Sequence, residues 1–216
     1  MEWTYILEEA GKYLVKTCED NPGIYDGDQF IYNDSYIGCV HQPDIQVLSP
    51  IFWEGKRVAW MVTAGHTLDV GGTEPGGLMV NTTEVYQEGI RLPGVKIVER
   101  GRMKKDIEDM MRGMVRQPDL FMLDVAAKIA ANNAGTKRLK EMIEKYGIDT
   151  ILTLFREMQD YSETLARARL RQIPDGTWRM VEYIESLREE EPYLRLELAA
   201  IKEGDELTLD FTGSSP

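Results

Sequence analysis

Histidine and cysteine are scarce in this chain of 216 residues, which has two of each. Two cysteines, Cys18 and Cys39, cannot build a disulfide framework and lack the CxxC spacing of a metal site, so we interpret them as reduced core residues. No apolar run reaches the roughly 18 residues that would cross a bilayer. The glutamate-containing N-terminus does not match a secretory leader. We therefore expect no membrane association and a cytoplasmic location.

Basic residues are also in short supply, because 25 lysines and arginines stand against 37 acidic residues and the formal net charge is -12. Non-specific binding to nucleic acid or to an anionic membrane requires a basic face, so we expect neither. The glycine-lysine pattern of a P-loop is missing as well, and we expect no ATP site on this chain. These absences leave an acidic globular protein of ordinary hydrophobic content.

The first hundred residues predict a β-rich region, because β-branched and aromatic residues alternate with Gly and Pro. The expected strands are KYLVKTC, QFIYND, DIQVLSPIFW and RVAWMVTA, and WEGKR predicts a hairpin turn between the last two. A Gly/Pro-rich loop follows from about residue 67 to about residue 94. Loops of this length inside a compact domain are usually functional or disordered.

Residues 101–176 predict three helices. The first contains MKKDIEDMMRGMV, whose methionine-rich face we interpret as core packing. Asp119 is expected to cap the second helix, Gly147 to end it, and Asp149 to open the third. Residues 177–216 return to strand patterns. The expected fold class is α+β, with mixed β-sheet regions flanking a central block of three helices, in the domains 1–100, 101–176 and 177–216.

Both histidines, His41 and His66, precede an aspartate by three positions, in HQPD and HTLD. His41 lies on a loop stiffened by Pro43, and His66 follows a predicted strand, so both side chains come from rigid strand ends. Two imidazoles and a carboxylate suit Mn²⁺, Fe²⁺ or Zn²⁺. We therefore predict one metal site formed by His41, Asp44 and His66. The alternative is a non-catalytic structural subunit in which the histidines are packed polar residues.

Three acidic residues in the loop after His66 are candidates for catalysis: Asp69, Glu84 and Glu88. Asp69 could bind the ion as a fourth ligand or orient an imidazole. Glu84 and Glu88 could serve as ligands or as acid/base groups, or they could be ordinary loop acids. The glycines of the intervening GGTEPGG segment would allow the backbone to approach a ligand closely.

Several motifs occur in a fixed order along nearly the whole chain. They are GDQFIYNDSYIGCVHQPDIQVLSPIF, HTLDVGGTEPGG, TEVYQEGIRLPGVKIV, DVAAKIAANNAGTKRL and the closing LDFTGSSP. Together they resemble the hydantoinase B family, which includes 5-oxoprolinase and the large subunits of ketone carboxylases. Within the family, HQPD and TEPGG are most similar to the acetone and acetophenone carboxylase branch.

This resemblance implies a division of labour between subunits. A hydantoinase A-type partner would bind ATP-Mg and phosphorylate the substrate, and this chain would hold Mn²⁺ or Zn²⁺ at His41, Asp44 and His66. In the carboxylase branch an activated enol, formed from a small-molecule ketone, is joined to activated CO2. The alternative within the family is an ATP-dependent amidohydrolase that opens a cyclic amide. Family members are longer than this chain, so the remaining parts of the subunit are expected partners.

Overall fold

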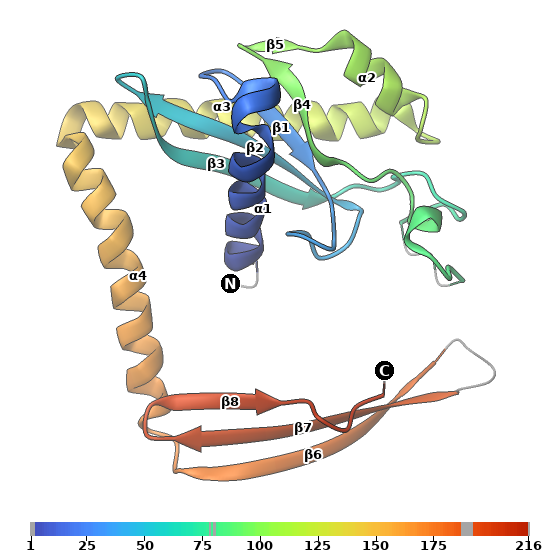
Figure 1. Ribbon diagram of the computed structural model, residues 1–216, viewed down its shortest axis with the longest axis vertical. Coiled ribbons are helices and arrows are strands. Elements are labelled where there is room, and N and C mark those ends of the chain that lie inside the picture. Colours follow the sequence, from blue (N-terminus) through green and yellow to red (C-terminus); the bar gives the residue numbers. More distant parts are fainter. Residues whose placement is uncertain (1–2, 78, 80, 187–191, 216) are drawn as a thin grey trace. The chain divides into compact units, whose positions relative to one another are not determined.

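The computed structural model describes residues 3–77, 79, 81–186 and 192–215. The chain forms two compact units, Met1–Lys145 and Tyr146–Pro216 (Figure 1). The described residues form four α-helices and two antiparallel sheets, which confirms the α+β class. Every helix among them is too short or too polar to cross a membrane. The three domains expected from composition stay a prediction.

The first unit is a five-stranded antiparallel sheet in the order β3-β2-β1-β4-β5, with helices packed on it. Its elements are α1 (Trp3–Cys18), a π-helical turn η1 (Glu19–Gly23), β1 (Gln29–Tyr32), β2 (Asp44–Trp53), β3 (Lys56–His66), a 3-10 helix η2 (Val85–Glu88), β4 (Pro93–Glu99), β5 (Arg102–Met103), α2 (Lys105–Arg112) and α3 (Pro118–Tyr146).

Both faces of this sheet are covered, because successive residues of a strand point to opposite sides. On one face Phe30, Tyr32 and Leu48 pack against Ala10 and Leu14 of α1. The other face packs against α2 and α3 (Figure 1), in a core that contains Ile31, Ile45, Val47, Val98, Met111, Phe121, Met122 and Val125. The strands are therefore held between two layers, and their ends are rigid positions for functional side chains.

Strands β2 and β3 form the hairpin that the sequence predicts. Its two-residue turn has positive φ at both positions, 48° at Glu54 and 77° at Gly55. This geometry matches the right-handed twist of the two strands. The ladder then runs the length of both strands and pairs Asp44 with His66 at the end farthest from the turn.

A β-bulge interrupts this ladder close to the turn. Phe52 pairs with Arg57, whereas Ile51 pairs with Ala59, so Val58 is one extra residue on β3. A bulge of this kind leaves one residue without a partner and increases the local twist. Every pair from Ile51 to the far end of the hairpin is shifted by one residue relative to the pairs beside the turn.

One expected strand is wrong, and two strands, β4 and β5, were not predicted. KYLVKTC lies inside α1, because Ala10, Leu14 and Cys18 recur every four residues and are all buried. The strand pattern of this short segment is overridden by helix packing. The long loop expected to end at about residue 94 runs into β4, which begins at Pro93 and pairs with β1 in the middle of the sheet.

The three helices of the expected central block are present as α2, α3 and α4 (Ile148–Leu170). Asp119, however, is not an N-cap, because α3 begins one residue earlier at Pro118. Proline is well suited to the first position of a helix, where its missing N–H has no partner to lose. Asp119 lies in the first turn instead, and its carboxylate accepts a hydrogen bond of 2.7 Å from Arg112.

The methionine-rich stripe is only partly a core face and only partly helical, because Met103 belongs to β5 and Met114 lies beyond the end of α2. Met111 is fully buried in the core, and Ile107 packs against it. Met103, Met110 and Met114 are between 37 and 49% exposed. The core interpretation therefore holds for the centre of this stripe and is wrong for these three methionines.

The second unit contains α4 (Ile148–Leu170), β6 (Gly176–Glu185), β7 (Tyr193–Glu203) and β8 (Glu206–Asp210). The three strands form an antiparallel sheet in sequence order. Strands in this part of the chain were expected from its alternating pattern. Of the described residues in this unit, only Ile151, Ala199 and Lys202 are buried.

Candidate metal centre

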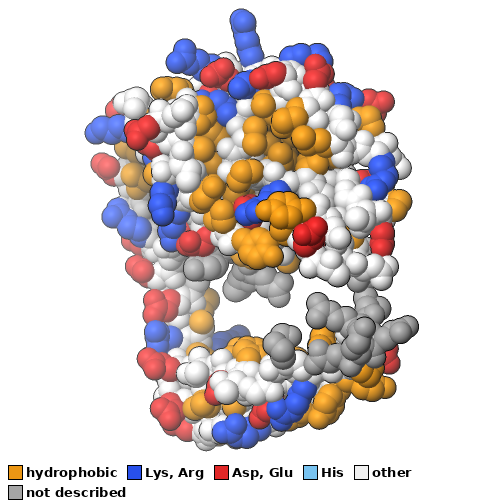
Figure 2. Space-filling view, turned by 45° about the vertical axis from the view of Figure 1, so that its right-hand side comes forward, with side chains coloured by type: hydrophobic (Ala, Val, Ile, Leu, Met, Phe, Trp, Pro, Cys, Tyr) orange, Lys and Arg blue, Asp and Glu red, His pale blue; other side chains and the backbone are white. Residues whose placement is uncertain are grey.

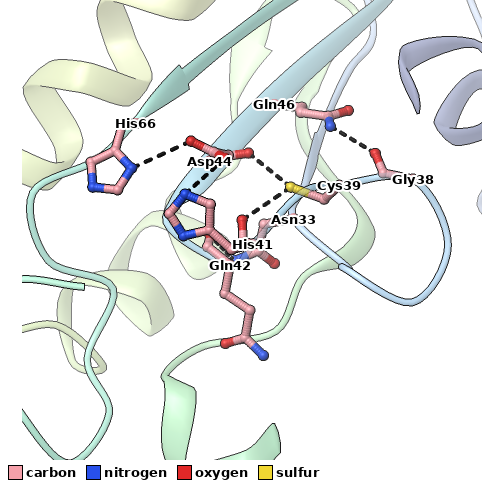
Figure 3. Close-up of polar contacts among 8 residues, drawn as sticks. All are labelled: Asn33, Gly38, Cys39, His41, Gln42, Asp44, Gln46 and His66. Atoms are coloured by element: carbon pink, nitrogen blue, oxygen red, sulfur yellow. Dashed lines mark hydrogen bonds and ion pairs between the residues drawn. The ribbon is translucent and has the colours of Figure 1, made fainter. Parts of the chain in front are cut away.

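The three predicted metal ligands meet at the end of the β2–β3 hairpin (Figure 3). Asp44 is the first residue of β2, and His66 is the last residue of β3. A turn closed by the Asp44 N–H, which donates to the His41 carbonyl at 3.0 Å, brings His41 back over Asp44. The two imidazole centroids are 5.0 Å apart.

One carboxylate contacts both imidazoles. His41 Nε2 lies 2.9 Å from Asp44 Oδ2, and His66 Nδ1 lies 3.3 Å from Asp44 Oδ1. The Asp44 side chain is 5% exposed, while those of His41 and His66 are 36% and 49% exposed. A buried carboxylate requires polar partners. The two imidazoles supply them, and they also leave the centre open to solvent on their own side.

The spacing of these groups fits a divalent cation. One donor atom from each of the three residues lies within 4.8 Å of the others. Donor atoms about 2.1 Å from a single ion are about 3.0 to 4.2 Å apart, depending on the coordination angle. The two nitrogen–oxygen distances in the centre, 2.9 and 3.3 Å, lie in or close to this range. The donors therefore fit a metal ion, and their role as ligands stays a prediction.

Cys39 and Asn33 hold the loop that carries His41 (Figure 3). The buried Cys39 thiol donates to the carbonyls of His41 and Asp44, each at 3.2 Å. Burial raises the pKa of this thiol to about 11, so it remains a protonated donor. Asn33 donates to the Gln42 carbonyl at 2.8 Å and accepts from the Leu92 N–H at 2.6 Å. Support of the His41 loop by Cys39 and Asn33 was not predicted from the sequence, although Asn33 follows a strand directly.

The loop after β3 also approaches the centre. The Pro43 carbonyl accepts a hydrogen bond of 2.8 Å from the Thr67 N–H, which extends the contact between the two strand ends. Gly77 of the GGTEPGG segment has φ +76°, and a Cβ atom there would lie 3.0 Å from Pro43 Cγ and 3.8 Å from His66 Nε2. The close backbone approach expected from these glycines is therefore an approach to the histidine centre itself.

The structure does not bring the three acidic catalytic candidates into this centre. Asp69 is buried, but its carboxylate accepts from the Gly71 N–H at 2.7 Å and faces Arg116 at 3.4 Å. Glu84 is exposed and precedes η2, and Glu88 ends η2 and is half-buried. Within the described ranges, the only group of three or more close metal-binding side chains is the histidine centre. Catalytic roles for Asp69, Glu84 and Glu88 stay predictions.

A buried lysine near the centre was missed by the sequence analysis. Lys128 of α3 is 7% exposed, and its ammonium donates to Thr67 Oγ1 at 3.3 Å. Burial lowers the pKa of Lys128, and the charges of Asp124 and Asp44 oppose this shift. The sequence does contain a signal for this position. Lys128 and Asn132 are polar residues four positions apart on one face of α3, and the other buried residues of this helix are mostly apolar.

Asn132 connects α3 to the strands that carry the centre. It is fully buried, and its amide donates to the Val47 carbonyl of β2 at 2.8 Å. The Thr63 hydroxyl of β3 donates to the Asn132 side-chain oxygen at 2.6 Å. One side chain of α3 thus bonds to both strands of the hairpin, which fixes the hairpin on the helix.

Comparison with known proteins places the chain in a family. Residues 4–216 match the family described as hydantoinase B/oxoprolinase. The chain belongs to this family. The acetophenone carboxylase delta subunit of Aromatoleum aromaticum (strain DSM 19018 / LMG 30748 / EbN1) is 33% identical over 207 residues, a match that covers 95% of this chain and 30% of that subunit.

Two solved structures have a similar fold. Nucleotide-free acetone carboxylase matches with a TM-score of 0.90 at 27% identity, over 97% of this chain and 29% of that chain. The ATP-dependent caprolactamase from Pseudomonas jessenii matches with a TM-score of 0.85 at 28% identity, over 94% of this chain and 35% of that chain. The chain thus spans about a third of the length of these relatives, which are ATP-dependent enzymes of two reaction types.

Proposed function

We propose that this chain is the metal-binding part of a hydantoinase B-type subunit in an ATP-dependent ketone carboxylase similar to acetone and acetophenone carboxylases. The observation that carries this proposal is the convergence of His41, Asp44 and His66, in a chain whose fold is similar to that of acetone carboxylase. ATP-Mg would bind to a hydantoinase A-type partner. The substrate would be a small ketone, which reacts as its enol with activated CO2.

The charges in the centre favour an anionic ligand. Two neutral imidazoles and one carboxylate compensate only one of the two charges of a divalent cation such as Mn²⁺ or Zn²⁺. When bound, the cation would supply Lewis acidity toward an oxygen that gains negative charge during the reaction. An enolate oxygen and a carboxylate oxygen are both of this type, and both occur in the carboxylation of a ketone.

The protein's own groups have separate roles in this proposal. Asp44 contacts both imidazoles and therefore sets their orientation, and the buried Cys39 thiol fixes the loop between His41 and Asp44. The half-exposed sides of the imidazoles leave room for a substrate. The backbone at Gly77 borders that space together with Pro43, because a Cβ at Gly77 would lie 3.0 Å from Pro43 Cγ and 3.8 Å from His66 Nε2.

Metal content is the first test. The protein would be isolated with its assembly, without added chelator, and its metal would be measured by elemental analysis. We expect about one equivalent of Mn or Zn per chain, and we expect His41→Ala and His66→Ala to lose it while circular dichroism stays unchanged. Glu84→Gln is the matched control, because Glu84 lies outside the centre. Full metal content in both histidine variants would refute the site.

Substrate-dependent ATP consumption is the second test. A ketone carboxylase should consume ATP only when both ketone and bicarbonate are present, and it should release the corresponding keto acid. Acetone and acetophenone are the appropriate probes, because these two relatives are named for them. Omitting either bicarbonate or ketone should reduce ATP consumption to background.

A cyclic amidohydrolase is the second candidate, and the similarity to caprolactamase favours it. In that case the assembly would consume ATP with caprolactam, hydantoin or 5-oxoproline and without bicarbonate. Turnover of one of these amides with no response to ketones would replace the carboxylase proposal. A third possibility is a non-catalytic structural subunit, which would contain no metal and would tolerate substitution of both histidines.

A further inference from the structure

The sheet of the second unit has one strongly apolar face. Residues directly opposite each other in an antiparallel sheet lie on the same face. Trp178 of β6, Ala200 of β7 and Leu209 of β8 form one such row, and Met180 pairs with Leu198 in the next. We call this the apolar sheet face, and its large exposed members are Trp178, Met180, Ile184, Leu207 and Leu209. The apolar sheet face also includes Glu182 and Lys202. The opposite face carries Arg179, Glu197, Thr208 and Asp210, and the exposed hydrophobic residues on it are Val181, Tyr183 and Tyr193.

The described residues of the second unit leave the large side chains of the apolar sheet face exposed. Its five large exposed members keep 47 to 54% of their surface accessible. The described part of the unit has three buried residues, too few to form a core. Hydrophobic side chains are visible at the surface of the part that holds β6, β7 and β8 (Figure 2). Contiguous exposed apolar surface on a sheet is typical of an interaction site.

Ion pairs connect the end of the helix of this unit to the sheet. Arg167 of α4 and Arg171, directly after α4, pair with Asp205 in the turn between β7 and β8, at 3.3 and 2.5 Å. In addition, β6 is an edge strand of ten residues, all exposed. A long exposed edge strand with apolar side chains promotes aggregation unless other chain covers it. Both features therefore require a covering partner.

We propose that the apolar sheet face is the contact surface for the part of a hydantoinase B-type subunit that lies outside this chain. The relatives identify this occupant. The chain matches acetone carboxylase over 97% of its own length but only 29% of the other chain, so the same sheet is accompanied there by a further two-thirds of a polypeptide. The occupant presents an apolar surface complementary to leucine, methionine and tryptophan side chains. This inference rests on family membership and is independent of the metal site.

Site-specific photo-cross-linking tests the proposal. Benzoylphenylalanine would be placed at Met180 or Leu209, and in matched controls at Arg179 or Thr208, which lie on the same strands with their side chains on the opposite face. The full chain would be irradiated within its assembly, and mass spectrometry would identify the cross-linked peptides. This works whether the occupant belongs to the same polypeptide or to a separate one.

We expect the first two positions to cross-link, severalfold more than the controls, to a hydantoinase B-type sequence outside the region matched by this chain. Cross-links to a second copy of this chain or to an unrelated protein would overturn the proposal, as would equal yields from both faces or no cross-link. As a second measurement, Met180→Glu and Leu209→Glu should lower the denaturation temperature of the assembly, and they should release the chain where the occupant is a separate polypeptide, whereas Arg179→Glu should do neither. Glutamate variants with an unchanged denaturation temperature and an intact assembly would also overturn the proposal.

Discussion

Asp44 and His66 are directly opposed at the open end of the β2–β3 hairpin, where their side chains lie on the same face of the sheet. His41 reaches the same carboxylate from the preceding turn. Each imidazole therefore contacts Asp44, and Asp44 contacts both. Because Asp44 is the shared partner of both histidines, we expect substitution of Asp44 to affect metal binding more than substitution of either histidine.

Asp44→Ala should weaken metal binding more than His41→Ala or His66→Ala. The substitution removes one ligand and also the group that orients the other two, and loss of an orienting partner alone typically weakens binding about 10- to 100-fold. Competition with a metal-binding dye would measure the order. Asp69→Asn is the control and should have little effect, because its carboxylate faces Gly71 and Arg116. Equal losses for Asp44→Ala and Asp69→Asn would contradict the assignment.

Gly77→Ala should weaken metal binding, and Gly76→Ala should not. Both glycines have positive φ, so alanine causes similar backbone strain at either position. A Cβ at Gly77 would lie 3.0 Å from Pro43 and near His66, whereas a Cβ at Gly76 would meet nothing within 4 Å. Isothermal titration calorimetry with Mn²⁺ or Zn²⁺ would measure the metal affinity of both variants. Because the backbone strain is similar in the two, a difference in affinity would report the contact made by the new Cβ atom. The same affinity in both would show that the loop does not border the centre.

Asn132→Ala should destabilise the protein, because it leaves the buried Val47 carbonyl without its donor and removes the acceptor of the Thr63 hydroxyl. Losing the partner of a buried polar group costs about 1 to 3 kcal/mol of unfolding free energy. Urea denaturation would measure it. In a double-mutant cycle with Thr63→Val, the combined loss should be smaller than the sum of the single losses, since the two side chains share one bond. Additive losses would be evidence against this bond.

Lys128→Met should change how stability depends on pH. The pKa of Lys128 is lower in the folded protein than its usual value of 10.5, so between the folded and unfolded values the unfolded state binds more protons. The free energy of unfolding of the wild type therefore rises with pH across this window, and the variant lacks this rise. Relative to wild type, Lys128→Met should be most stable near neutral pH, with an advantage that shrinks toward pH 10.5.

Urea titrations at several pH values would follow this difference. Lys137→Met is the matched control, because Lys137 lies on the same helix and is exposed. A constant difference between wild type and Lys128→Met across the range would show that the buried ammonium does not titrate as expected.

Much of the site could be predicted from sequence because its parts are local. His41 and Asp44 are three residues apart, and the turn at Glu54 and Gly55 is a short hairpin signal that brings His66 back to Asp44. The supporting residues are different. Lys128 reaches the centre from a helix more than sixty positions along the chain, through a contact that depends on how the helix packs. Local patterns carry no information about such packing.

The two errors in the predicted elements have different causes. The segment KYLVKTC contains aromatic and β-branched residues, and only its packing against Phe30 and Tyr32 makes it a helix. Asp119 is a good cap by residue type, but the proline before it already starts the helix. The first case was decided by packing partners distant in the sequence, whereas the second was decided by the neighbouring residue Pro118.

The bulge at Val58 has a consequence for how the hairpin can change in length. The β3 side contains one residue more than the β2 side, and the bulge takes up this surplus before the site is reached. In an unbroken ladder, Gly65 would lie opposite Asp44, and His66 would point to the other face of the sheet. Deletion of Val58 should therefore leave a regular ladder in which Asp44 still meets His66. Deletion of Val62, beyond the bulge, would bring Thr67 opposite Asp44 and turn the histidine away from it.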